Sequence, residues 1–208
     1  MAANQELEQY LSQLPGVGPR QAKRIILSLL RREPYFSRRL GDLVHSVRSN
    51  MKLCQQTFQY FYSEDPTETL SPIAADPHRD HSQILVVESD SDLEAIEKTE
   101  LWNGSYFVLG GQLKPSASEA SYNDFIRLDE LTSIISDRYH KDGDKTEIIL
   151  GLSSTVNGDF SSEVIKAAIM DISDNINVTH LGRGLSTGTA LEYVDKTTLE
   201  SALNHRTI

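Results

Sequence analysis

Two glycines within the stretch from Leu14 to Leu30 (LPGVGPRQAKRIILSLL) have the spacing of a turn that can bind phosphate. Gly16 and Gly18 flank one apolar residue, and glycine tolerates positive φ and lets a partner approach the backbone closely. Pro19 suits the first turn of a helix, where its missing N–H is not needed. Free N–H groups at the turn and the positive end of the helix dipole then favour a phosphate oxygen. We expect this contact to involve Gly16, Val17, Gly18, Arg20, Lys23 and Arg24.

The same stretch resembles the helix-hairpin-helix element of proteins that bind DNA without reading its sequence. In that element, Ala22 lies where the second helix packs closely on the first. The alternative is an ordinary helical hairpin, in which the Gly-x-Gly only turns the chain and the cations form a solvated face. The cations beside the turn favour the DNA-binding interpretation, because flexible positive side chains bind phosphates.

The charge of the chain is divided unevenly along its length. The 208 residues have a formal net charge of −10. Residues 1–52 contain 9 Lys and Arg against 4 Asp and Glu, and residues 53–208 contain 11 against 26. A basic segment beside the hairpin is the expected footprint of phosphate contact. The acidic remainder would be repelled by DNA and is free to face protein partners.

The sequence shows no pattern of membrane attachment or of a disulfide framework. It lacks the run of about eighteen apolar residues that a membrane span needs, and its first residues lack the pattern of a secretory signal. Cys54 is the single cysteine, which excludes an internal disulfide and a four-cysteine zinc site. We therefore expect a cytoplasmic protein.

Helical periodicity predicts three helices in the first 52 residues, at 5–13, 19–32 and 37–52, with Pro34 stopping the second. The third helix has a stripe of apolar residues that we expect to face a core, namely Leu40, Leu43, Val44 and Val47. From residue 53 to residue 82 the periodicity disappears, and Pro66, Pro72 and Pro77 indicate an irregular connector.

The following region alternates between strand and helix patterns. Strands are predicted at 84–88, 106–109, 147–152 and 178–181, and helices at 91–99, 129–139 and 161–171. Ser91 and Glu94 have the spacing of a capping box for the first of these helices. Such alternation predicts a mainly parallel sheet covered on both faces. The glycine-rich loop at 182–188 lacks the Gly-Lys-Ser/Thr ending of a P-loop, so we expect a turn there.

Glu88 follows a buried strand, at the edge where open α/β sheets place their sites. Enzymes of the Toprim type pair such a glutamate with an Asp-x-Asp-x-Asp-Gly cluster that binds Mg²⁺. The equivalent turn here has Ser153, Thr155 and Asn157 before Gly158. Neutral side chains cannot replace three carboxylate charges. We therefore expect no catalytic residue and no cofactor.

We assign Glu88, Asp90 and Asn157 at this sheet edge to one of two roles. They either contact a partner or are the remnant of a catalytic site. The alternative is a metal-dependent enzyme acting on nucleic acid, which would use Glu88 with Asp90 or Asp92. Elsewhere the connector has residue types that ligate metals, but in a polar loop they are usually solvated. No metal site is predicted at Cys54, Asp76, His78, Asp80 or His81.

Several motifs occur in the order seen in the RecR family of bacterial recombination mediators. They are the hairpin, Val-Val-Glu88, Val-Leu-Gly-Gly111, the turn ending at Gly158, and the loop ending at Gly188 followed by Leu-Glu-Tyr193. The resemblance covers nearly the whole chain and implies an α+β multidomain fold. It implies an N-terminal helical helix-hairpin-helix domain, followed by an α/β Toprim-like domain with a mainly parallel sheet. The implied boundaries are 1–52, a connector at 53–82, the Toprim-like domain at 83–175 and an assembly segment at 176–208.

The resemblance also implies a function. RecR proteins act in DNA repair without catalysis, binding single- and double-stranded DNA with no sequence preference. They work with RecO-like and, in some systems, RecF-like proteins to help load the RecA recombinase on single-stranded DNA covered by single-strand-binding protein. They assemble into ring-like tetramers, so we expect a homotetramer. The remaining alternative is a protein scaffold whose basic end meets an acidic partner and not DNA.

The connector departs from the family, which has a small zinc finger with two Cys-x-x-Cys pairs at this place. Cys54 keeps the first position, Thr57 replaces its pair-mate, and Thr67 and Leu70 are assigned to the second pair. Four-thiolate zinc is therefore impossible, and the finger is degenerate. The nearby aromatic residues either pack as a small core or form a strip on which bases stack. These residues are Phe58, Tyr60, Phe61 and Tyr62.

Overall fold

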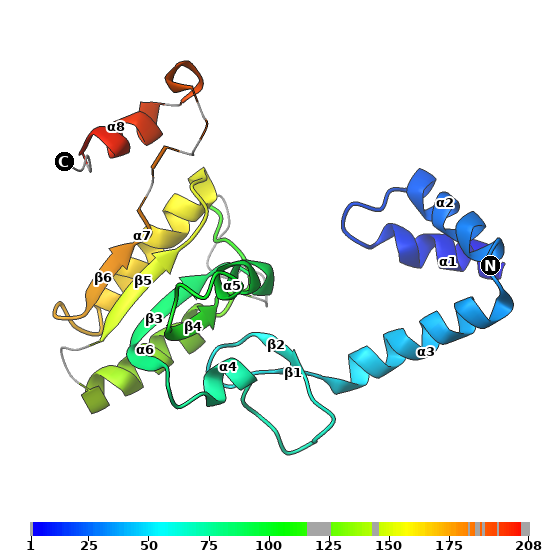
Figure 1. Cartoon of the computed structure of the whole chain (residues 1–208), viewed down its shortest axis with the longest axis horizontal. Helices are drawn as coiled ribbons and strands as arrows, with labels where there is room; N and C mark the ends of the chain where they lie inside the picture. Colours follow the sequence, from blue (N-terminus) through cyan, green and yellow to red (C-terminus); the bar gives the residue numbers. More distant parts are fainter. Residues whose placement is uncertain are drawn as a thin grey trace. The chain divides into compact units, whose positions relative to one another are not determined.

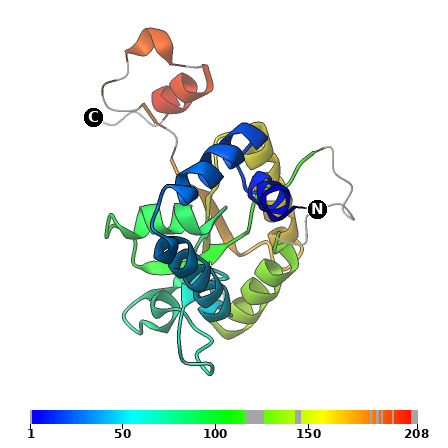
Figure 2. The same cartoon turned by 90° about the vertical axis from the view of Figure 1, so that its right-hand side faces the viewer.

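The computed structural model describes residues 2–115, 126–142, 146–182, 184–185, 188, 190–194 and 196–204. The chain divides into two compact units. The amino-terminal unit contains Met1–Lys52 and Tyr62–Pro66, and the sheet unit contains Leu53–Phe61 and Thr67–Ile208. The elements of each can be followed by colour in Figure 1 and, after a quarter turn, in Figure 2. None of the helices within the described ranges has both the length and the apolar character of a membrane span.

Three helices form most of the amino-terminal unit, as the sequence predicts. They are α1 (Ala3–Ser12), α2 (Pro19–Leu30) and α3 (Pro34–Asn50). Helix α3 begins three residues earlier than expected, because Pro34 occupies its first turn and does not only separate it from α2. Proline is well suited to that position, since its N–H would have no partner there.

The apolar stripe of α3 is exposed, so the prediction that it faces a core within this chain is wrong. The side chains of Leu40, Leu43, Val44 and Val47 are 41%, 44%, 63% and 50% exposed. Ala22, in contrast, is fully buried and is the only buried residue of α2. The periodicity correctly indicated an apolar face on α3. It contained no information about what covers that face.

The connector after α3 contains more regular structure than the sequence predicts. Residues Met51–Leu53 (β1) and Tyr60–Tyr62 (β2) form a two-stranded sheet, and Pro72–Ala75 forms the short helix α4. Strands of three residues are too short for an alternating pattern to show in a sequence. The expectation of an irregular connector is therefore corrected.

A four-stranded sheet is the centre of the sheet unit (Figure 1). Its strands have the order β4-β3-β5-β6, and every neighbouring pair is parallel. The strands are β3 (Asp80–Val87), β4 (Gly104–Val108), β5 (Glu147–Gly151) and β6 (Asn177–His180). The prediction of a mainly parallel sheet in an α+β chain is confirmed. In this register Val87 lies beside Val108 on one neighbour and Gly151 on the other.

Helices cover both faces of this sheet because alternate residues of its strands point to opposite sides. One core cluster joins the sheet to α6 (Leu128–Asp142) and α7 (Val156–Met170). Its buried members include Ile84, Val86, Leu131, Ile135, Ile165 and Ile169. The cluster on the other face joins the sheet to α5 (Asp90–Glu97) and includes Leu85, Val87 and Leu93. A 3₁₀ turn at Leu191–Tyr193 and helix α8 (Lys196–Asn204) follow β6.

Two helices of the sheet unit begin at residues other than those predicted. Ser89 and Asp92 form the capping box of α5, so the assignment of Ser91 and Glu94 is wrong. Helix α7 begins at Val156 and not at 161, because the Thr155 hydroxyl accepts a hydrogen bond from the N–H of Gly158 and caps its first turn. The expected turn through Asn157 and Gly158 is therefore the first turn of a helix.

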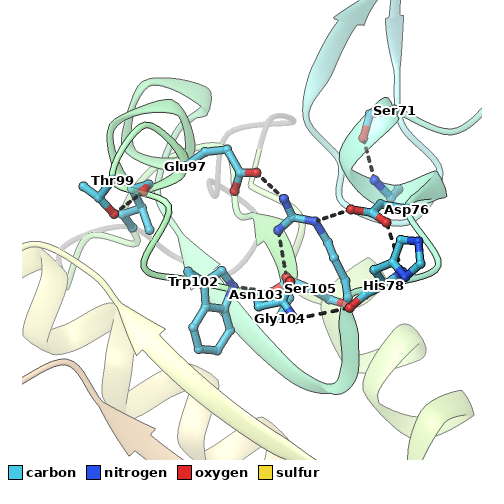
Figure 3. Close-up of polar contacts among 12 residues, drawn as sticks. Ser71, Asp76, His78, Glu97, Thr99, Trp102, Asn103, Gly104 and Ser105 are labelled. Atoms are coloured by element: carbon cyan, nitrogen blue, oxygen red, sulfur yellow. Dashed lines mark hydrogen bonds and ion pairs between the residues drawn. The ribbon is translucent and has the colours of Figure 1, made fainter.

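Arg79, which directly precedes β3, connects the start of the sheet to its neighbours. Its guanidinium donates to the carboxylate of Glu97 and, at 3.2 Å, to the carbonyl oxygen of Gly104; both partners are shown in Figure 3. Its side chain is 9% exposed and lies 5.7 Å from the centre of the Tyr106 ring. Burial and the adjacent Glu97 raise the pKa of Tyr106 above its usual range. A buried charge is tolerated here because it is paired.

The first prediction concerns Gly158, because its position has no room for a side chain. A Cβ added there would lie 1.9 Å from the carbonyl oxygen of Ser153, far inside van der Waals contact. Gly158→Ala should therefore lower the free energy of unfolding by about 1–3 kcal/mol, the usual cost of overpacking. Urea unfolding followed by circular dichroism would measure this change.

The matched control is Gly182→Ala in the same unit, where an added Cβ would meet no atom within 4 Å. This variant should unfold at the same urea concentration as the unaltered protein. Equal stability of the Gly158→Ala and Gly182→Ala variants would contradict the close packing of α7 on the turn before it.

Candidate functional site

The hairpin between α1 and α2 presents backbone N–H groups without a side-chain cap. Gly18 is the N-cap of α2 and has no side chain to accept their hydrogen bonds. The first N–H groups of a helix have no acceptor within the helix. Those of Arg20 and Gln21 are thus left for an external acceptor, because Pro19 has no N–H. An oxygen of a phosphate group would suit this position, since the helix dipole is positive there.

The two hairpin glycines have different roles in the structure. Gly16 has a φ of +76°, which only glycine adopts readily, and the N–H of Val17 closes the turn on the carbonyl oxygen of Leu14 at 3.0 Å. Gly18 has a φ of −79°, an ordinary value for any residue. Positive φ is therefore required at Gly16 but not at Gly18. At both positions an added Cβ would meet no atom within 4 Å, so the turn is open to a partner.

The predicted cations of α2 are exposed but are not equally free. Lys23 forms an ion pair with Glu8 of α1, with 3.7 Å between the charged atoms. Arg24 donates a hydrogen bond to the side chain of Gln21 at 3.4 Å. Arg20 has no hydrogen bond or ion pair to the described residues. Glu8 could not be identified from the sequence as the partner of Lys23, because the two residues lie on different helices.

The carboxylate of Glu88 links three segments at the carboxyl edge of the sheet. It accepts hydrogen bonds from the backbone N–H of Ser153 at 2.6 Å and from its hydroxyl at 2.8 Å. The side-chain amide of Gln112 lies 2.9 Å from each of its two oxygens. The parallel register brings Ser153 here, because Gly151 lies beside Val87. Both carboxylate oxygens are thus occupied by donors from the protein, an arrangement that differs from a metal site.

The other acidic residues considered at this edge also have structural partners. Asp90 accepts a hydrogen bond from the N–H of Tyr60 at 2.6 Å and so connects the connector to α5. Asp92 accepts from the N–H and hydroxyl of Ser89 at 3.0 and 2.6 Å. Asn157 accepts a bond from Ser161 through its backbone oxygen, and its side chain has no polar contact with the described residues. The structure therefore does not gather Glu88, Asp90 and Asn157 into one polar cluster.

The connector aromatics divide between packing and exposure. Phe61 is 6% exposed, and the ring of Phe58 lies 5.2 Å from that of Phe107 in the sheet unit, measured between centroids. Tyr60 and Tyr62 are 47% and 50% exposed. Phe61 is thus buried, and the partly buried Phe58 packs against the core of the sheet unit. Only the two tyrosines have a face available for a partner.

The residues around Cys54 differ from those that the sequence indicated. Its buried sulfur accepts hydrogen bonds from the N–H groups of Thr57 at 3.5 Å and Ser71 at 3.3 Å. Burial by itself would raise the pKa of the Cys54 thiol, but these donors outweigh burial and the pKa is lowered. Ser71 therefore lies beside Cys54, where the sequence indicated Thr67 and Leu70. Within the described residues, no three His, Cys, Asp or Glu side chains are grouped so that they can hold a metal ion.

The fold and the two sites define a class of protein: a helix-hairpin-helix unit joined to a Toprim-type sheet domain that lacks the acidic metal-binding cluster. Three family models match the chain in the same order. They are the helix-hairpin-helix of RecR at residues 4–47, the Toprim domain at 82–182 and the C-terminal region of RecR at 184–207.

Comparison of the whole chain with known proteins gives the particular family. Recombination protein RecR of Frankia casuarinae is 34% identical over 204 residues, which are 98% of this chain and 96% of the relative. The RecR of Streptomyces avermitilis is 35% identical over 97% of this chain and 94% of the relative. That of Alcanivorax borkumensis is 34% identical, with 93% and 90% covered. The chain belongs to the RecR family of recombination proteins.

Glu88 generates the second prediction. In Glu88→Gln, one carboxylate oxygen becomes an amide NH₂ group, which cannot accept hydrogen bonds. The donors that now bond to that charged oxygen would lose their acceptor. We expect the free energy of unfolding to fall by about 1–3 kcal/mol. Urea unfolding would measure the loss, with Glu163→Gln as the control, because Glu163 is exposed on α7 and has no polar contact with the described residues.

Two results together would contradict this role: unchanged stability of Glu88→Gln, and a stabilisation by Mg²⁺ of the unaltered protein but not of this variant. Glu88 would then bind a cation and would not stabilise the sheet edge through hydrogen bonds within the protein.

Proposed function

We propose that this protein is a non-enzymatic recombination mediator that binds DNA without sequence preference. It would act in the cytoplasm with RecO-like and RecF-like partners to promote RecA loading on single-stranded DNA. The observation that carries the proposal is the open, uncapped hairpin at the start of α2 with Arg20, Lys23 and Arg24 around it. Membership of the RecR family supports the role in recombination, since the relatives are named recombination proteins.

The proposed DNA contact uses two kinds of donor. Backbone N–H groups of Arg20 and Gln21, next to the turn through Gly16, Val17 and Gly18, bind one phosphate, and the flexible cations of α2 bind its neighbours. Neither kind of donor reads the edges of bases, so the contact has no sequence preference. The Glu8–Lys23 ion pair joins an exposed lysine to a half-buried glutamate and is therefore weak, so a phosphate can replace Glu8 at little cost.

The absence of catalysis is part of the same proposal. A Toprim-type enzyme would need carboxylate oxygens open toward Mg²⁺. Glu88 has both oxygens bonded to Ser153 and Gln112, and Asp90 and Asp92 bind backbone groups. The alternative of a metal-dependent enzyme therefore requires a rearrangement of this edge. Cleavage, joining or primer synthesis on labelled DNA with Mg²⁺ or Mn²⁺ that disappears in Glu88→Gln would establish it.

The third prediction tests the DNA contact by its dependence on salt. Each lost phosphate contact should lower the magnitude of the salt slope by about one per subunit engaged. The double variant Lys23→Ala, Arg24→Ala should therefore bind DNA more weakly and lower that magnitude by about two per engaged subunit. Fluorescence anisotropy with labelled single-stranded DNA, repeated over a series of salt concentrations, would measure both quantities.

The control is the double variant Lys98→Ala, Lys114→Ala, which removes the same charge from exposed positions of the sheet unit. Its salt slope should match that of the unaltered protein. If the hairpin variant keeps the original affinity and slope, the hairpin is not the DNA site. Absence of DNA binding by the unaltered protein at low salt would favour the scaffold alternative.

We further propose that the protein forms a homotetramer, to which segment 176–208 contributes contacts. The exposed stripe of α3 supports an interface in the amino-terminal unit, because adjacent apolar side chains on one helix face are rarely left in water. Phe36 at 45% exposed continues this stripe. Its positions 36, 40, 43 and 47 have the alternating spacing of four and three residues along which two helices pack.

The fourth prediction tests this interface. Leu43→Asp would place a charge in the middle of the α3 stripe, where burial against a second copy would be costly. We expect light scattering to show a smaller assembly than for the unaltered protein at the same concentration. His45→Asp introduces the same side chain on the opposite side of α3, where the residue is exposed, and should leave the mass unchanged. A strictly monomeric unaltered protein would exclude the tetramer.

A further inference from the structure

The connector contains two turns with the same hydrogen-bond geometry. In the first, the N–H of Thr57 donates to the sulfur of Cys54, three residues earlier, at 3.5 Å. In the second, the N–H of Ala74 donates to the hydroxyl of Ser71, three residues earlier, at 3.2 Å. The turns face each other, because the N–H of Ser71 lies 3.3 Å from the Cys54 sulfur. The four positions that a finger with two Cys-x-x-Cys pairs would use are therefore 54, 57, 71 and 74.

The side chains at these four positions do not fit zinc. Structural zinc sites use thiolate, imidazole or carboxylate ligands, usually four of them. Here there is one thiol, two hydroxyl groups and one methyl group, from Cys54, Thr57, Ser71 and Ala74 respectively. A single strong ligand cannot hold a structural zinc ion. The turns must therefore be joined in another way.

Gln59 joins them. Its side-chain oxygen accepts hydrogen bonds from the Thr57 hydroxyl at 3.3 Å and from the Ser71 hydroxyl at 3.1 Å. Its backbone oxygen also accepts from the N–H of Cys54 at 2.9 Å. One glutamine thus contacts the three polar positions of both turns.

Burial makes this connection important for stability. Cys54, Thr57 and Ser71 are at most 2% exposed, so their polar groups have little access to water. A buried polar group without a partner destabilises the folded state, whereas a fully bonded network fixes one arrangement.

We infer that a metal-free hydrogen-bond network centred on the Gln59 side chain replaces zinc in this finger, so that the connector folds and stays folded without any metal ion. Purified protein should contain no stoichiometric zinc after dialysis, and EDTA should not shift its thermal unfolding. One zinc per chain that survives dialysis, with a fall in stability on chelation, would overturn the inference.

The first variant experiment tests Gln59 itself. Gln59→Ala leaves the hydroxyl groups of Thr57 and Ser71 without their acceptor, and we expect the folding equilibrium constant from urea unfolding to fall by at least about tenfold. The control is Gln56→Ala, the same substitution three residues away at an exposed side chain. Equal stability of the two variants would overturn the role of Gln59.

The second experiment rebuilds the metal site. The triple variant Thr57→Cys, Ser71→Cys, Ala74→Cys completes four thiols at the positions that the turns identify, and it should gain one tightly bound zinc, or Co²⁺ with the absorption of tetrahedral thiolate. The control variant Thr57→Cys, Thr67→Cys, Leu70→Cys has the same number of thiols at the positions indicated by sequence and should gain none. A folded triple variant that binds no metal would show that 71 and 74 are not the finger positions. Should that variant fail to fold, the comparison of Gln59→Ala with Gln56→Ala still decides the inference.

Discussion

The burial of strand β3 on both of its faces is the constraint on which the sheet unit depends. Its residues Ile84–Val87 are at most 2% exposed. A strand of this kind needs a partner on each edge and a helical layer on each face, which β4, β5 and the surrounding helices provide. The first polar side chain after it, Glu88, must then lie at the carboxyl edge, beside the segment that follows β5.

This position explains how a Toprim-type edge is stable without metal ligands. A carboxylate at position 153 would repel Glu88 unless a cation lay between the two. Serine instead donates two hydrogen bonds to Glu88, one from its backbone and one from its hydroxyl. Ser153, which stands where the Toprim-type pattern has a carboxylate, therefore attracts Glu88 instead of repelling it. In the connector, the neutral hydroxyl groups of Thr57 and Ser71 likewise share one acceptor, the side-chain oxygen of Gln59.

Local patterns in the sequence predicted most of the fold, and what they missed are helix caps, very short strands and contacts between distant residues. The apolar run of β3, the strand and helix alternation and the helical hairpin are properties of neighbouring residues. The start of α7 was missed because it depends on the Thr155 cap and on Gly158 fitting against Ser153, neither of which a periodic pattern shows. The contact of Cys54 with Ser71 spans 17 residues, and that of Glu8 with Lys23 joins two helices. The residues proposed for the hairpin site could be named from the sequence because all of them lie within one local motif.

The two units differ in how much of their stability they supply themselves. Ala22 is the only buried apolar side chain described in the amino-terminal unit, whereas the sheet unit has two core clusters. A helical unit with so small a core has little to offset the conformational entropy of folding. Under the proposed assembly, burial of the α3 stripe between copies supplies the missing stability. The same step brings several hairpins onto one DNA molecule. Each hairpin binds a few phosphates weakly, but the assembly binds DNA more tightly than one hairpin does, because the second and later contacts form at high effective concentration.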